Sequence, residues 1–209
     1  MELTRRRDLI IDSAPILTWR RTDPDAAVGQ ASAHHPRPLL LGYRVHTPLC
    51  RGTGLPLLFR LSTAEVHDAT FARPLLELAI RLLGIRPRVI RLDAGYWGLK
   101  LIAWIHCTLG AVAVIPWNPK RQQRRDGLPP TWTAEELGKR TSIERFVGRV
   151  LVFLRLQRPP IFGWSALETR VALTYAAIWV VALAAWQEGR PDLIRSPRLV
   201  PAHVWEGVE

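Results

Sequence analysis

The stretch RVIRLDAGYWG, residues 88–98, joins a short apolar run to a carboxylate, Asp93, which is followed by a glycine and two aromatic residues. The short apolar run favours a strand, and the break after it places Asp93 at the C-terminal end of that strand. A second run of this kind, DLIID at residues 8–12, ends in Asp12. Ligands gather beyond the carboxyl ends of strands in open α/β sheets, so both aspartates are candidate site residues.

Outward from this stretch, hydrophobic periodicity and turn residues predict the remaining elements. Residues 19–38 read as a loop. Two apolar runs flank the turn RGTG at residues 51–54 and predict a hairpin. Further predicted elements are a strand at residues 111–119 and helices at residues 67–84, 98–110, 141–157 and 165–186. Three strands followed by alternating helices and strands indicate an α/β chain with a ribonuclease-H-like mixed sheet flanked by helices.

The 209 residues are enough for one domain of ordinary size, which we assign to residues 1–188. A proline-rich tail at residues 189–209 is predicted to be poorly ordered. The two cysteines, Cys50 and Cys107, form no CxxC pair, and a reducing compartment fits them best. The apolar run VALTYAAIWVVALAAW at residues 171–186 is shorter than the roughly 20 residues of a membrane span, so it is read as a core helix. A small membrane-associated protein is the alternative.

The net charge is +11, and only three of the 29 cationic residues are lysines. Arginine binds phosphate through two parallel hydrogen bonds and stacks on bases, so this excess of arginine suits a nucleic-acid partner. A codon bias would produce the excess equally well. A basic loop after the last predicted strand is interpreted as tracking phosphates, or else as an ordinary solvated loop; its cations are Lys120, Arg121, Arg124 and Arg125.

If the first and fourth predicted strands are neighbours, Asp12 and Asp93 face each other. Like charges that close need a cation between them, and hard carboxylate oxygens favour Mg²⁺ or Mn²⁺. Each aspartate could instead cap a following turn. A third acid, Glu144, borders the apolar stripe of the 141–157 helix and could reach over the sheet edge or pair with Arg140. Arg145 and Arg149 are expected on the exposed side of that helix, where they would contact phosphate.

The ordered set IIDSAPI, GYRVH, TGLPLLFRLSTAEVHDA, RLDAGYWG and RTSIERFVGR resembles the DDE catalytic core of insertion-sequence transposases over roughly residues 9–186. In that family an aspartate follows the first strand, another follows the fourth, and a glutamate lies on a late helix. Those positions are matched by Asp12, Asp93 and Glu144, separated by 81 and 51 residues.

The resemblance implies metal-dependent DNA cleavage and strand transfer, with Asp12, Asp93 and Glu144 as both catalytic residues and metal ligands. It implies transposon ends and target DNA as partners, a homo-oligomer assembled on DNA, no membrane, and a cytoplasmic, nucleoid-associated location. Arg140, Arg145 and Arg149 join the basic loop as expected DNA-binding residues. A catalytically inactive DNA-binding remnant is the alternative.

The sequence departs from the family pattern in its last motif. The tyrosine three residues before the arginine and the lysine seven residues after the glutamate are replaced by Leu137 and Leu151. Arg149 is a candidate substitute for the lysine. The chain also begins almost at the first strand, where family members carry a DNA-binding region, so we expect an N-terminally truncated core.

Two further pairs lie close to the candidate acids in sequence. His67 and Asp68 are expected to cap the next helix and brace the site. Tyr96 and Trp97 follow Asp93 within the 88–98 stretch; they are expected in the core or at the rim, with stacking on an unpaired base as the alternative.

Overall fold

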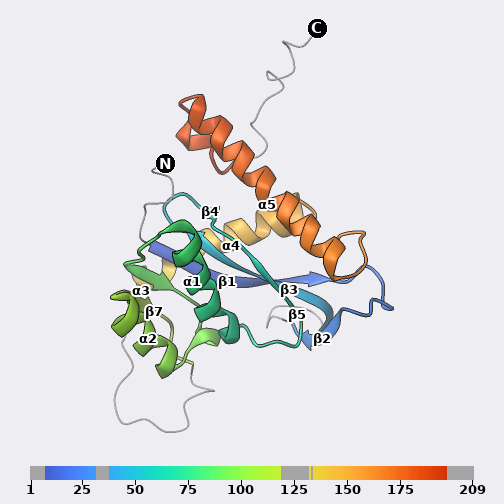
Figure 1. Ribbon diagram of the computed structural model, residues 1–209, viewed down its shortest axis with the longest axis horizontal. Coiled ribbons are helices and arrows are strands. Elements are labelled where there is room, and N and C mark those ends of the chain that lie inside the picture. The colour runs from blue at the N-terminus through green and yellow to red at the C-terminus, as the bar shows by residue number, and fades with distance from the viewer. Residues whose placement is uncertain (1–7, 32–37, 119–131, 133, 197–209) are drawn as a thin grey trace.

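The computed structural model describes residues 8–31, 38–118, 132 and 134–196. Figure 1 shows one curled mixed sheet with helices on both faces. Its strands are β1 (Asp8–Leu17), β2 (Ala27–Gln30), β3 (Leu39–Cys50), β4 (Leu55–Pro56), β5 (Arg60–Thr63), β6 (Val89–Arg91) and β7 (Val112–Val114). The helices are α1 (Ala69–Leu83), η2 (Ala94–Tyr96), α2 (Leu99–Leu109), α3 (Ala134–Gly138), α4 (Thr141–Gly148), the π-helical turn η4 (Arg149–Phe153), α5 (Trp164–Gln187) and η5 (Pro191–Leu193).

The sheet order is β2-β3-β1-β6-β7, with β3 antiparallel to β1, and with β6 parallel to both β1 and β7. The outer edge of β3 is shared by β2, β5 and β4, which pair with successive parts of it. The predicted hairpin is therefore confirmed, and the first and fourth predicted strands, β1 and β6, are neighbours. This is the ribonuclease-H-like arrangement expected from the element order.

Strand β1 separates two hydrophobic cores because its side chains alternate between the faces of the sheet. Ile10, Ala14 and Ile16 pack into a core with α4, η4 and α5, whereas Leu9 and Ile11 pack against α1 and α2. Asp12 has the same parity as Ile10 and Ala14, so the alternation assigns it to the α4 face. The Asp12 carboxylate of β1 therefore lies near the N-terminal end of α4.

Three predicted boundaries are corrected by the structure. Strand β1 continues past Asp12 to Leu17, because β3 pairs with it as far as Gly42, so Asp12 lies within the strand and not at its end. The predicted 19–38 loop contains β2, where Gly29 runs so close to the Ala64 carbonyl that a Cβ would stand 1.9 Å from the oxygen. The helix predicted to reach residue 157 closes at Phe153, where η4 ends it in a wider turn.

Helix α5 is long and apolar enough by length and composition to cross a membrane, with mean hydropathy 1.5 over its most apolar window. One-third of that window is buried, and Val171, Tyr175 and Ile178 belong to the first core. A core helix passes the same test of length and composition, so this helix is weak evidence for a membrane. After α5, Arg195 Nε donates to the Thr53 carbonyl at 2.7 Å, so the first part of the tail packs on the β3–β4 turn.

Candidate active site

Asp12 and Asp93 converge because of the strand register. The parallel pairing of β1 with β6 ends at Ile10 opposite Arg91, and each aspartate lies two residues further along its chain. Extending this register by two residues matches Asp12 with Asp93. Their charges interact, since the negative charge of Asp93 helps to raise the pKa of Asp12. The structure therefore brings together the first two acids that the sequence predicted.

The Asp12 carboxylate is held in a largely buried position. Its Oδ1 accepts a hydrogen bond from the Ser13 amide at 2.8 Å, and its Oδ2 lies 3.2 Å from Arg140 Nη2. Burial, and after it the charge of Asp93, raises the pKa of Asp12 to about 6, although Arg140 acts in the opposite direction. One arginine thus only partly compensates the negative charge at this position, which favours an added cation.

The Asp93 carboxylate is oriented by the turn that follows it. Oδ1 accepts from the Gly95 amide at 2.7 Å, which makes Asp93 the N-cap of η2. A Cβ at Gly95 would stand 2.9 Å from that oxygen, so glycine is needed for this close approach. Asn118 Nδ2 donates to the Ala94 carbonyl at 3.0 Å and ties the same turn to the segment after β7. Asp93 therefore caps a turn, which was the alternative to a site role, and its charge also acts on Asp12.

A third carboxylate, Asp68, borders the pair from the α1 face. Its Oδ2 lies 3.4 Å from Arg44 Nη1, and that same nitrogen donates to Ser13 Oγ at 3.4 Å. Burial raises the pKa of Asp68, Arg44 opposes the shift, and the charge of Asp93 adds to it. Asp68 therefore shares the electrostatic environment of Asp93 without following a strand.

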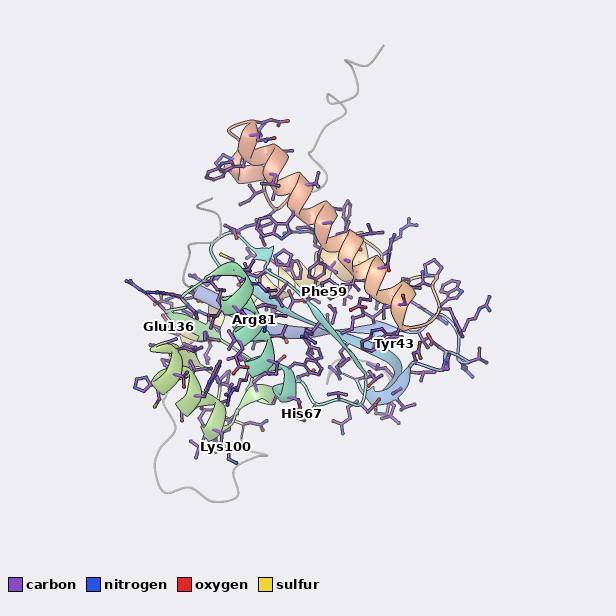
Figure 2. All side chains as sticks on the ribbon, viewed as in Figure 1. Tyr43, Phe59, His67, Arg81, Lys100 and Glu136 are labelled. Atoms are coloured by element: carbon purple, nitrogen blue, oxygen red, sulfur yellow. The ribbon has the colours of Figure 1, made fainter. Side chains whose placement is uncertain are left out.

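His67 and Asp68, the two residues before α1, were both predicted to cap the helix and brace the site, but only His67 makes a side-chain cap bond. His67 Nδ1 accepts from the Ala69 amide at 3.1 Å and caps the helix, at whose N-terminal end it lies in Figure 2. Asp68 makes no side-chain cap bond and turns to Arg44 instead. Tyr96 and Trp97 are buried in the α1–α2 core, as the expectation of a core role required.

Glu144 is not gathered into the pair. It lies on α4, one turn after Arg140, and its side chain is exposed. Among the described residues it has no hydrogen-bond or ion-pair partner, and Asp12 is met instead by Arg140, the residue directly before α4. Within the same part of the chain, no group of three or more His, Cys, Asp or Glu side chains is placed to hold a metal ion.

The predicted DNA-binding cations fall into different environments. The basic loop lies outside the described residues. Arg145 is exposed as expected, but Arg149, the first residue of the π-helical turn, is half-buried. Burial and the charge of Arg195 lower the pKa of Arg149. Arg140 is engaged inside the protein by Asp12.

Sequence reasoning missed a buried ion network at the opposite end of β1. Arg91, only 3% exposed, donates from Nε to Asp8 Oδ1 at 3.1 Å and from Nη1 to Glu136 Oε2 at 2.8 Å. Arg51 also pairs with Asp8, at 3.2 Å. The network joins β1, β6 and the turn after β3 to α3, where Figure 2 shows Glu136. The sequence signal for this network was Arg91 itself, a charged residue between the apolar Ile90 and Leu92.

Comparisons with known proteins agree with this architecture. A piggyBac transposase, solved by cryo-EM as a synaptic complex with hairpin DNA, is similar in fold, with a TM-score of 0.54 and 12% sequence identity. The similarity covers 93% of this chain and 52% of that one, so the chain spans about half the length of that transposase. No curated protein matches the sequence. The family model described as the transposase DDE domain matches residues 4–180, and the chain belongs to that family.

Proposed function

We propose that this chain is a transposase catalytic core that cleaves DNA strands and transfers them with the help of divalent metal ions. The observation that carries the proposal is the register that sets Asp12 opposite Asp93 beyond the end of β6. Family membership and the fold similarity to a DNA-bound transposase support DNA as the partner. Assembly of several copies on transposon ends and target DNA, at the nucleoid, is part of the same proposal.

The residues present suit a divalent cation. Members of this family generally use divalent metal ions, and the Asp12 and Asp93 carboxylates offer the hard oxygen ligands that Mg²⁺ and Mn²⁺ prefer. Burial, and after it the charge of Asp93, raises the pKa of Asp12 despite Arg140, so a divalent cation would stabilise the ionised carboxylate. Asp12 and Asp93 would hold the metal, and Glu144 would complete the set from α4.

The chain's own groups orient the reacting parts. When bound, a divalent cation supplies charge stabilisation at the phosphate and activation of the attacking hydroxyl. The Gly95 amide fixes the carboxylate of Asp93, and the Ser13 amide and Arg140 fix that of Asp12. Arg145, in the last turn of α4, would hold the DNA backbone near this pair. Leu151 stands where the family has a lysine, so Arg149 is the candidate to take over the role of that lysine.

A non-catalytic DNA-binding protein is the second candidate function. It is favoured by the position of Glu144, which the described structure does not bring to the aspartate pair. Such a protein would keep the basic surface and the salt-dependent affinity for DNA but would show no metal-dependent cleavage.

The test is a cleavage assay on supercoiled plasmid with Mg²⁺, Mn²⁺ or EDTA, run beside a DNA-binding assay. Asp12→Asn, Asp93→Asn and Glu144→Gln are each expected to abolish metal-dependent cleavage while DNA affinity stays close to that of the unaltered chain. Glu77→Gln, an exposed acid on α1 paired with Arg73, is the matched control and should cleave normally. Cleavage by Asp12→Asn or Asp93→Asn at the unaltered rate would refute the proposal. DNA binding without any cleavage by the unaltered chain would favour the second candidate.

A further inference from the structure

A hollow of about 460 Å³ lies at the edge where the β3–β4 turn, the α3–α4 segment and the tail meet. Four cationic side chains line it: Arg51, Lys139, Arg145 and Arg195. The lining contains a single carboxylate, Glu135, which is already paired with Lys139 at 3.0 Å. We call this hollow the basic pocket.

Two of these cations have no carboxylate partner among the described residues. The side chain of Arg145 makes no hydrogen bond or ion pair there. Arg195 donates from Nε to the Thr53 carbonyl and from Nη2 to the Gly52 carbonyl. These two bonds orient the guanidinium without neutralising it, and up to three of its five N–H groups remain for a ligand.

The surroundings of the basic pocket add to its positive charge. Arg149 lies close enough to Arg195 for the charge of Arg195, with burial, to lower the pKa of Arg149. Like charges held together are unfavourable, and an anion between them removes that cost. The hydroxyl of Ser142, also in the lining, is buried and has no partner within the described chain. It can donate to an anion that lies among the guanidinium groups.

The basic pocket is separate from the aspartate pair. Arg51, in its lining, pairs with Asp8, which lies four residues before Asp12 on β1. At about 3.3 Å per residue, Asp8 and Asp12 are roughly 13 Å apart along the strand. That span corresponds to about four nucleotides along one strand of duplex DNA.

We propose that the basic pocket is a second phosphate-binding site, which holds a DNA backbone phosphate a few nucleotides from the aspartate pair. Arg145 and Arg195 supply the bidentate contacts, and Ser142 donates the third hydrogen bond. This rests on the proposed function for its DNA partner. The basic pocket differs from the proposed metal site in its residues, because neither Arg195 nor the hollow was indicated by the sequence. It also differs in its chemistry, because it needs no metal.

The test is DNA affinity by fluorescence anisotropy across a salt series, on the full chain in EDTA. Arg145→Gln and Arg195→Gln should each weaken binding and lower the slope of log affinity against log salt by about one. Arg81→Gln, which removes an exposed cation near the end of α1, is the matched control and should keep the slope (Figure 2). Thermal unfolding of each variant checks that Arg195→Gln still folds, and Arg145→Gln changes only an exposed side chain.

The outcomes separate this site from the proposed function. Unchanged slopes in both variants overturn the basic pocket even where cleavage is normal. Reduced slopes with no cleavage support the pocket and refute only the catalytic proposal. Inorganic phosphate should raise the unfolding temperature of the unaltered chain more than chloride at equal ionic strength, and duplex DNA should remove that difference. Phosphate stabilisation that DNA does not compete with would mean a small-anion site and would overturn the DNA assignment.

Discussion

Arg140 Nη2 lies 3.2 Å from Asp12 Oδ2, which joins the residue before α4 to the middle strand of the sheet. Both side chains are about one-fifth exposed, so the pair is only partly screened by solvent. The contact orients the Asp12 carboxylate and fixes the start of the helix that carries Glu144. The position of the Asp12 carboxylate and the balance of its negative charge therefore depend on the same ion pair.

Loss of Arg140 should destabilise the chain through Asp12. Arg140→Ala leaves a buried carboxylate beside Asp93 without its counter-charge, and we expect a loss of about 1–3 kcal/mol in the free energy of unfolding. In an Asp12→Asn background the same change should cost clearly less, because no buried charge is stranded. Urea denaturation of the four proteins of this double-mutant cycle measures the difference. Equal costs in both backgrounds would show that the pair is not coupled.

Neutralising one acid of the pair should stabilise the metal-free chain. Asp93→Asn keeps an oxygen that can accept from the Gly95 amide, but it removes the repulsion with Asp12. We expect the free energy of unfolding in EDTA to rise by about 0.5–2 kcal/mol. Magnesium should raise the unfolding temperature of the unaltered chain and not that of the variant. A variant that is less stable in EDTA and still responds to magnesium would contradict the assignment of Asp93.

Local patterns in the sequence were sufficient for the strands and helices that carry the acids. β-branched runs ending in aspartate and amphipathic spacing in α1 and α4 are short-range signals, and each element formed close to its predicted place. Strand β2 was missed because its pairing with β3 is decided by contacts distant in sequence, including the approach of Gly29 to Ala64. The end of β1 was missed for the same reason, since β3 extends it past Asp12.

The site was predictable only as far as the register of β1 and β6. Asp12 and Asp93 follow from parallel neighbouring strands, whereas the contact of Arg140 with Asp12 depends on how α4 docks. Asp68 shows the same limit: residue type and position before a helix predicted a cap, but Arg44 across the sheet attracts its carboxylate. Tertiary contacts of this kind leave no periodic trace in the sequence.

Gly95 offers a way to move the Asp93 carboxylate without changing its charge. In Gly95→Ala the new Cβ would stand 2.9 Å from Asp93 Oδ1, so the carboxylate has to shift. We expect stability within about 1 kcal/mol of the unaltered chain, since a side-chain end can yield, but a weaker magnesium response and slower cleavage. Gly98→Ala is the matched control, because its Cβ would come no closer than 4.0 Å to the Tyr96 carbonyl. Equal magnesium responses in the two variants would show that the Asp93 orientation is unimportant.

His46 predicts how the stability of the fold depends on pH. The ring is fully buried, stacks on Phe71 and shares a hydrogen bond of 2.8 Å between Nε2 and Ser62 Oγ. Burial, and after it the charge of Arg44, lowers the pKa of His46 from 6.5 to about 3, although Asp68 Oδ1 lies 3.8 Å from Nδ1. Between these two values the unfolded chain binds a proton that the folded chain does not. The contribution of the buried, neutral His46 ring to stability is therefore complete above pH 6.5 and is lost as the pH falls towards 3.

The slope of this loss approaches about 1.4 kcal/mol per pH unit for one proton. His46→Gln retains a hydrogen-bonding group for Ser62 but does not titrate, so it should cost stability at pH 7.5 and flatten the decline between pH 6 and 4. Urea denaturation at a series of pH values measures both curves. His106→Gln, on the exposed side of α2, is the control and should follow the unaltered chain. Parallel curves for His46→Gln and the unaltered chain would mean that the buried ring takes up its proton without unfolding, and the burial argument for this residue would fail.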